Sequence, residues 1–265
     1  MESLLQVENL TKSYGDRLLF GDITFGVNEG DKIGIIAKNG TGKTTLLKIL
    51  CNKEDYDSGN VTYRKDAKVG FLEQIPDLNP NQTVFEVCLS GYDKEKEEDW
   101  AFENRIKQTL SQLKITNFNQ PVSELSGGQI KRVALAKLIL DNCELLILDE
   151  PTNHLDIEMI EWLEGYLSRS KVAVLMVTHD RYFLDKVCNK IIEIDQQSIF
   201  TYHGNYNYYL EKRQERIEAQ TAEVEKAKNL LRTELEWMRR QPQARGTKAK
   251  YRIDAFYDLK DKALN

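Results

Sequence analysis

The chain has 265 residues, of which 41% are hydrophobic and 30% charged, with a formal net charge of −5. This composition suffices for one large α/β domain, or two small ones, with a proper core. No stretch approaches the roughly 18 apolar residues of a membrane helix, and the N-terminus lacks a signal peptide's basic start and apolar run. We therefore expect a cytoplasmic protein with no membrane partner. The negative charge excludes a surface that binds nucleic acid throughout, but not a local basic patch.

Residues 3–27 alternate between apolar and polar side chains on either side of a turn at 13–16. This pattern predicts short antiparallel strands. Tyr14 lies in the turn, where its ring could stack on a purine or cover the edge of the hairpin. The residues alone leave both interpretations open.

Residues 32–45 combine an apolar strand, a glycine loop and the start of a helix. The loop follows the pattern G-x-x-x-x-G-K-[ST], with Ala37 in place of the first glycine, which should stiffen the loop without abolishing the site. In such a loop the backbone N–H groups surround one anion, Lys43 reaches the β- and γ-phosphates, and Thr44 offers its hydroxyl to Mg²⁺. The residues predicted to bind nucleotide here are Lys38, Asn39, Gly40, Thr41, Gly42, Lys43, Thr44 and Thr45.

The next segments predict an inserted helical subdomain at about 75–140. Gln74 ends the strand before it, and a loop rich in Pro, Asn and Asp follows, so this amide lies where loops carry function. Ser126 can cap the helix 130–140, and Gly127 and Gly128 would leave its N-terminal N–H groups uncovered. Together with Gln129, these residues predict a second anion-binding helix end.

Two later apolar strands end in polar residues. The run 145–148 leads into Asp149 and Glu150, and two carboxylates at a buried strand end are costly without a partner. Nucleotide-bound Mg²⁺ is the expected partner of Asp149, which leaves Glu150 to orient or deprotonate a water. The alternative is a solvated acidic turn. The strand 172–177 leads to His179, a candidate γ-phosphate sensor at the same sheet edge.

These motifs resemble, in order and spacing, the ATP-binding cassette (ABC) ATPases over roughly residues 3–203. The resemblance implies a P-loop NTPase core with a mixed α/β sheet, an antiparallel β edge and an inserted helical subdomain. It also implies Mg²⁺-dependent ATP hydrolysis between two cassettes that face each other head to tail. The implied roles are adenine stacking for Tyr14, Walker A for Lys43 and Thr44, the Q-loop and a metal contact for Gln74, the signature motif for Ser126, Gly127, Gly128 and Gln129, Walker B for Asp149, the catalytic glutamate for Glu150 and the switch histidine for His179.

Three further segments resemble the ABC-F branch, most closely its Uup-like group. They are the run 150–156, Gly204-Asn205-Tyr206, and the run 236–240. The last two resemble parts of the linker that joins two cassettes in this branch, whose members lack membrane domains and are generally ribosome-associated translation factors. With one P-loop and one signature, we expect an N-terminal cassette at 1–203 and part of a linker at 204–265. A complete chain would have to pair with itself.

The C-terminal tail independently predicts a long helix, because residues 206–241 contain no Pro or Gly. At 1.5 Å per residue this helix would be about 54 Å long, as a linker or as a coiled-coil dimerisation helix. A basic segment and the start of a return helix should follow. Six cations without an acidic residue between them predict contact with RNA phosphates, as tRNA or rRNA: Arg239, Arg240, Arg245, Lys248, Lys250 and Arg252.

The sequence hypothesis is therefore an ATP-gated clamp that acts on the ribosome and needs a second cassette for full activity. Three alternatives stay open at this point. They are the ATPase subunit of a transporter, a DNA-acting ATPase in repair or recombination, and a binding module that uses ATP only to dimerise.

Overall fold

The computed structural model describes residues 3–90 and 99–239. The predicted return helix and the cations Arg240, Arg245, Lys248, Lys250 and Arg252 lie outside these residues. The chain forms two compact units, Met1–Tyr209 and Leu210–Asn265. In the described ranges, no helix has both the length and the apolar character needed to cross a bilayer.

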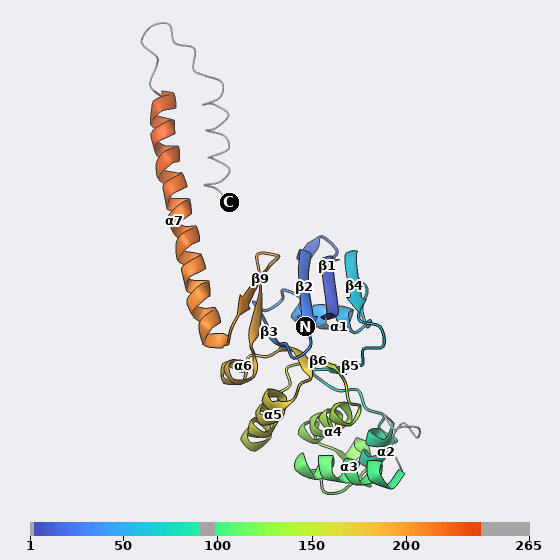
Figure 1. Cartoon of the computed structure of the whole chain (residues 1–265). Coiled ribbons are helices and arrows are strands. Elements are labelled where there is room, and N and C mark those ends of the chain that lie inside the picture. The colour runs from blue at the N-terminus through green and yellow to red at the C-terminus, as the bar shows by residue number, and fades with distance from the viewer. Residues whose placement is uncertain (1–2, 91–98, 240–265) are drawn as a thin grey trace, which may run out of the picture. The chain divides into compact units, whose positions relative to one another are not determined.

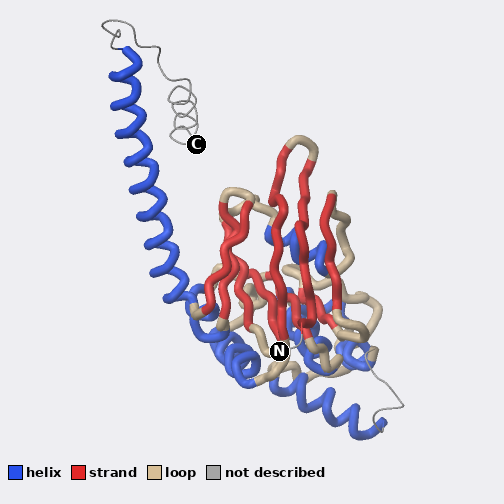
Figure 2. The backbone as a smooth tube through the Cα atoms, turned by 45° about the horizontal axis from the view of Figure 1, so that its top comes forward, coloured by secondary structure: helices blue, strands red, loops and turns tan. Residues whose placement is uncertain are grey.

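The centre of the first unit is a six-stranded mixed sheet in the order β5-β6-β7-β3-β8-β9. Its strands are β3 (Lys32–Ala37), β5 (Val69–Leu72), β6 (Leu145–Asp149), β7 (Ala173–Val177), β8 (Lys190–Asp195) and β9 (Ser198–His203). The first five strands run parallel, and β9 pairs antiparallel with β8. The strands of the chain are drawn red in Figure 2. Because β6 and β7 are buried along their whole length, they are nearly continuous apolar runs.

A separate three-stranded antiparallel sheet has the order β2-β1-β4. It consists of β1 (Ser3–Tyr14), β2 (Arg17–Asn28) and β4 (Ser58–Tyr63). The antiparallel strands predicted over residues 3–27 are present as β1 and β2, which have 12 residues each and are paired across several register shifts. The predicted antiparallel region is therefore a sheet of its own.

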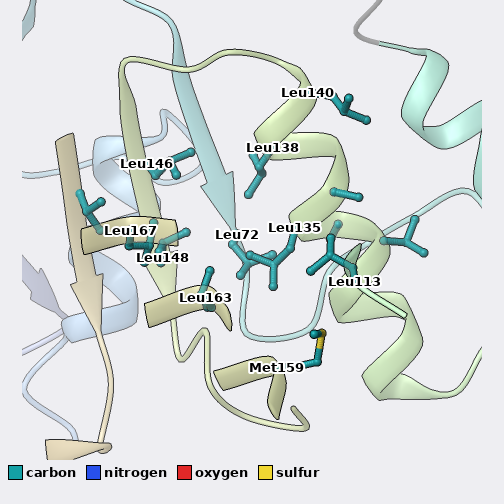
Figure 3. Close-up of a cluster of buried hydrophobic side chains, with 14 of the residues drawn as sticks. Leu72, Leu113, Leu135, Leu138, Leu140, Leu146, Leu148, Met159, Leu163 and Leu167 are labelled. Atoms are coloured by element: carbon teal, nitrogen blue, oxygen red, sulfur yellow. The ribbon is translucent and has the colours of Figure 1, made fainter. Parts of the chain in front are cut away.

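Two hydrophobic clusters cover opposite faces of the central sheet. Side chains alternate along a strand, so Leu145 and Ile147 pack with α1 (Lys43–Leu50) and the antiparallel sheet. Leu146 and Leu148 face the other way, toward α4 (Gly127–Leu140) and α5 (Ile157–Arg169), as Figure 3 shows. The core thus lies in two layers, one on each side of the sheet.

The inserted helical subdomain falls between β5 and β6 in the sequence. It contains α2 (Val84–Leu89), α3 (Asp99–Gln112), the short 3₁₀ helix η1 (Val122–Glu124) and α4, and its helices lie together in Figure 1. Ser126 caps α4 as expected, since its hydroxyl accepts a hydrogen bond from the Gln129 N–H. The predicted α/β fold with a mixed sheet and an inserted helical subdomain is confirmed.

The long C-terminal helix is also confirmed, as α7 (Tyr206–Arg239), which has 34 residues. Its first turn is fixed to the first unit through α6 (Arg181–Val187). Asp185 in α6 accepts hydrogen bonds from the main-chain N–H and the side-chain amide of Asn207, both at 3.0 Å. The buried Tyr209 donates to Glu193 in β8. The first residues of α7, up to Tyr209, therefore belong to the first unit.

Candidate functional site

A polar cleft of about 360 Å³ opens at the carboxyl ends of the parallel strands. Ligands of open α/β sheets bind at this edge, because the loops that leave the strands meet there. The loop after β3, the start of α1 and the ends of β5, β6 and β7 all contribute to it. Its lining residues are Asn39, Gly40, Gly42, Lys43, Thr44, Thr45, Gln74, Asp149, Glu150, Asn153, Val177 and His179.

Glycines shape the loop that forms the floor of the cleft. Gly40 and Gly42 have φ angles of 78° and 91°, a left-handed conformation that favours glycine. A Cβ on Gly42 would also lie 2.9 Å from the side chain of Leu19. Ala37 is not among the residues with positive φ. Alanine therefore replaces the first glycine of the motif without backbone strain.

Lys43 extends along this loop. Its ammonium donates to the carbonyls of Ala37 at 2.9 Å and Lys38 at 3.2 Å. An ammonium has three N–H donors, so one remains for an anion in the cleft. Burial lowers the pKa of Lys43, while the nearby charges of Glu150 and Asp149 oppose that shift. A terminal phosphate would add further negative charge beside this cation.

The acidic pair lies at the end of β6, and its two members differ in environment. Asp149 is 2% exposed. Burial raises its pKa, while a hydrogen bond from Thr44 and the charges of Lys131, Lys48 and Lys43 oppose the shift. Glu150 has a φ of 48°, which is strained for a residue with a side chain. Asp149 is thus buried among cations and a hydroxyl, as a metal ligand would be.

Glu150 and His179 lie together at the edge of the cleft. The Glu150 carboxylate accepts a hydrogen bond from the His179 main-chain N–H at 3.3 Å, and the His179 Nε2 lies 3.5 Å from its other oxygen. The His179 side chain is 69% exposed, whereas that of Glu150 is 8% exposed. The histidine can therefore turn toward a ligand while the glutamate stays in place.

The predicted signature residues lie outside the lining of this cleft. Ser126 and Gln129 bond to each other's main chain as a capping box. A Cβ on Gly127 would meet nothing within 4 Å, but one on Gly128 would lie 2.7 Å from the His154 carbonyl oxygen. The first glycine therefore borders open space, and the expectation that both glycines leave the N–H groups of the helix end uncovered stays a prediction. The small size of Gly128 lets the main chain at His154 pack closely against α4.

Tyr14 also lies outside the lining of the cleft. It is 52% exposed at the end of β1, its hydroxyl bonds Glu54, and the Lys12 ammonium lies 5.1 Å from its ring. The role of Tyr14 in stacking on adenine therefore stays a prediction.

The structure adds three residues that were not predicted to belong to the site. Arg17 donates to the Gly40 carbonyl at 2.8 Å and supports the loop from outside. Asn153 lines the cleft after the acidic pair. Lys131 is buried in α4, where burial lowers its pKa to about 8. Only Lys131 carries a sequence signal, as a cation among the apolar positions of a helix.

Comparison with known protein families identifies the family to which the chain belongs. A family model described as "ABC transporter" matches residues 20–153, and a second model with that description matches residues 192–264. The chain belongs to the ABC transporter family. Within this family it is a member of the ABC-F branch, so the resemblance noted in the sequence is confirmed. The first match places the phosphate loop and the acidic pair inside an ABC cassette.

Curated relatives extend beyond this ABC chain. The ATP-binding protein YfmR of Bacillus subtilis is 46% identical over 295 residues, covering 98% of this chain and 47% of the relative. The "energy-dependent translational throttle protein EttA" of Mycobacterium tuberculosis is 34% identical, covering 97% and 52%. The chain thus spans about half the length of these relatives.

The fold is that of solved ABC cassettes. The dimeric structure of the cassette MJ0796 bound to ADP and Pi has a TM-score of 0.65 and 23% identity. The match covers 76% of this chain and 98% of that one. This likeness supports the α/β cassette fold.

Proposed function

We propose that this ABC cassette binds and hydrolyses ATP as half of an ATP-gated clamp that acts on the ribosome. The observation that carries the proposal is the convergence of a cation, a hydroxyl, two acids and an imidazole in one cleft. These groups belong to Lys43, Thr44, Asp149, Glu150 and His179. Phosphoryl transfer needs this combination of positioning and electrostatic stabilisation.

Each residue of the cleft has a separate task in the proposed hydrolysis. The N–H groups of the loop 38–45 and the Lys43 ammonium bind the phosphates. Glu150 orients the attacking water and accepts its proton, because its carboxylate lies at the cleft edge. His179 donates to the γ-phosphate after turning from Glu150. The water oxygen bonds to the γ-phosphorus as the bond from that phosphorus to the β–γ bridging oxygen breaks, so that ADP and phosphate are released.

The cleft contains oxygen atoms beside Lys43 that are suited to bind Mg²⁺. Thr44, Gln74 and Asp149 supply hydroxyl, amide and carboxylate oxygens, the hard ligands that this ion prefers. The buried carboxylate of Asp149, whose pKa burial raises, would gain a divalent partner. These three residues would hold Mg²⁺, which supplies neutralisation of phosphate charge.

A second cassette completes the proposed site. Ser126, Gly127 and Gln129 are not among the lining residues of their own cleft, and Gly127 leaves space at the start of α4. This helix end can bind the phosphates held by a partner cassette. Since the γ-phosphate would then contact both halves, its hydrolysis releases them. The dimer of the related cassette MJ0796 supports this pairing.

The ribosome is the proposed target of the clamp. The name of the Mycobacterium tuberculosis relative, a translational throttle protein, supports a role in translation. The six cations from Arg239 to Arg252 supply the positive charge that an RNA backbone attracts. The linker then contacts tRNA or rRNA.

The test of hydrolysis is the substitution Glu150→Gln. The amide keeps the size of the side chain but cannot accept the proton of the water, so kcat should fall by at least about 100-fold. ATP affinity should stay within about threefold of the parent, since Lys43 and the loop are unchanged. Steady-state ATPase assays and ATP titrations measure the two quantities.

Glu144→Gln is the control, because this glutamate lies before β6 and bonds Arg64 outside the cleft. Its kcat should equal that of the parent. A Glu150→Gln variant with the parent's kcat would remove Glu150 from catalysis.

A further inference from the structure

Lys131 is a buried lysine at the centre of the nucleotide cassette. It is 1% exposed. Its ammonium donates to three main-chain carbonyls: Glu73 at 3.0 Å, Gln74 at 3.1 Å and Asp149 at 3.3 Å. All three donors of the ammonium are thereby used. One side chain from α4 thus connects the ends of two sheet strands.

The sheet itself does not supply this connection. The register between β5 and β6 ends at the pair Leu72 and Leu148, so Glu73 and Gln74 lie beyond the last paired residues of β5. Glu73 is half-buried and Gln74 is exposed, so no strand partner and little surrounding structure holds their carbonyls. The Lys131 ammonium supplies donors where the ladder between the two strands stops.

The choice of a cation is not explained by packing. Lys131 stands among apolar residues of α4, including Val133, Ala134 and Leu135, all buried. Among the residues that the structure describes, it takes part in no salt bridge. A buried charge is unfavourable unless it is compensated, and the nearby charges of Asp149 and Glu150 compensate that of Lys131 only in part, since burial still lowers its pKa. The three carbonyls that the ammonium bonds supply the remaining compensation.

We propose that Lys131 is a positioning residue for ATP hydrolysis, which holds the Gln74 side and the Asp149–Glu150 side of the cleft at a fixed separation. The inference rests on the proposed hydrolysis. Lys131 does not touch the reacting atoms, and it acts through the main chain of Gln74 and Asp149. A shift of about 1 Å in such groups can reduce a rate by about 100-fold.

The same lysine joins both sides of the cleft to the helix that Ser126 caps. Near that helix start, Gly128 packs against the His154 carbonyl, four residues beyond Glu150. The first turns of α4 therefore contact the Gln74 loop through Lys131 and the segment after Glu150 through Gly128. A partner nucleotide bound at this helix end would stabilise the fixed separation.

The test compares Lys131→Met with Lys131→Gln and with the control Lys137→Met. Methionine has a similar length but no donor, whereas glutamine keeps two N–H donors. Lys137 is a half-buried lysine of the same helix that does not line the cleft. Lys131→Met should lower kcat for ATP by about tenfold or more, with KM within about threefold, because the phosphate loop is intact. Lys131→Gln should recover part of kcat, and Lys137→Met should match the parent.

Two results would overturn the proposal. One is a kcat for Lys131→Met equal to that of Lys137→Met. The other is a lower melting temperature with an unchanged kcat per folded molecule, which would make Lys131 purely structural. A parent protein without ATP turnover would contradict the proposed function instead.

Hydrogen exchange of the nucleotide-free protein then decides the role of Lys131 on its own. The amides of Glu73, Gln74, Ile75, Glu150, Thr152 and Asn153 should exchange about tenfold faster in Lys131→Met than in Lys137→Met, because the strand ends are no longer held together. Equal exchange in the two variants would refute the connection.

Discussion

The chemistry of the cleft depends on residues held in unfavourable environments. Asp149 is almost fully buried, and Glu150 has a left-handed backbone. A backbone of this kind costs about 1–3 kcal/mol and persists only where the surroundings enforce it. For Glu150 they include the bond from its N–H to the Val177 carbonyl at 2.8 Å. The fold thus maintains the positions of the acids before any ligand binds.

The two glycines at the start of α4 allow a direct test of packing. Gly128→Ala places a methyl group within 2.7 Å of the His154 carbonyl oxygen, so the main chain has to shift. We expect a loss of about 1–3 kcal/mol in the free energy of unfolding, the usual cost of overpacking. Denaturant unfolding followed by circular dichroism measures it.

Gly127→Ala is the matched control, since its new methyl group meets open space. Its free energy of unfolding should stay within about 0.5 kcal/mol of the parent or rise, because alanine favours helices. Equal losses in the two variants would contradict the close contact between α4 and His154.

At the same scale, the sequence identifies residues that act through their side chains. Lys43, Asp149 and Glu150 belong to motifs whose spacing carries their chemistry, and the structure places all three on one cleft. Lys131 and Arg17 bond to main-chain carbonyls instead. Any residue supplies such a carbonyl, so the sequence does not identify the partners of these cations, although the apolar neighbours of Lys131 mark that lysine itself as unusual.

At the scale of elements, the patterns predict where strands and helices lie but not every detail of how the strands pair. The buried strands β6 and β7 and the helix α7 follow from their patterns. The alternation also predicts the antiparallel pair β1 and β2, but not the register shifts between them. Similarly, Gly59 resembles a turn residue but lies in β4, where a Cβ would meet the Asn9 carbonyl of β1 at 2.5 Å.

The cations of the linker are proposed to bind RNA. Replacing Arg239, Arg240 and Arg245 by alanine should therefore weaken binding to ribosomes or RNA. If each cation neutralises one phosphate, the slope of log K against log salt should become shallower by about 2. Binding measured at several salt concentrations gives both quantities.

A second triple variant separates local contacts from net charge. Lys65, Lys107 and Lys171 are exposed on the cassette, and their replacement by alanine removes the same charge. It should leave affinity and slope nearly unchanged. Equal effects of the two triple variants would show that the linker cations act only through overall charge.

At the scale of the whole molecule, the proposed clamp requires a nucleotide that two cassettes share. The chain covers about half of its curated relatives, and its own signature residues lie outside its own cleft. The cleft with Lys43 supplies one half of the proposed site, and the helix end at Ser126 supplies a half to another cassette. ATP binding in the cleft is the property on which the clamp, the linker and the ribosomal role all depend.

The affinity of the chain for ATP in the presence of Mg²⁺, measured by calorimetric titration, tests this claim most directly. Lys43→Met removes a charged hydrogen bond worth about 1.5–3 kcal/mol, so the parent should bind and the variant should bind about tenfold to 100-fold more weakly. Lys65→Met, an exposed control, should bind like the parent. No binding by the parent, or equal affinities of the parent and Lys43→Met, would contradict the account.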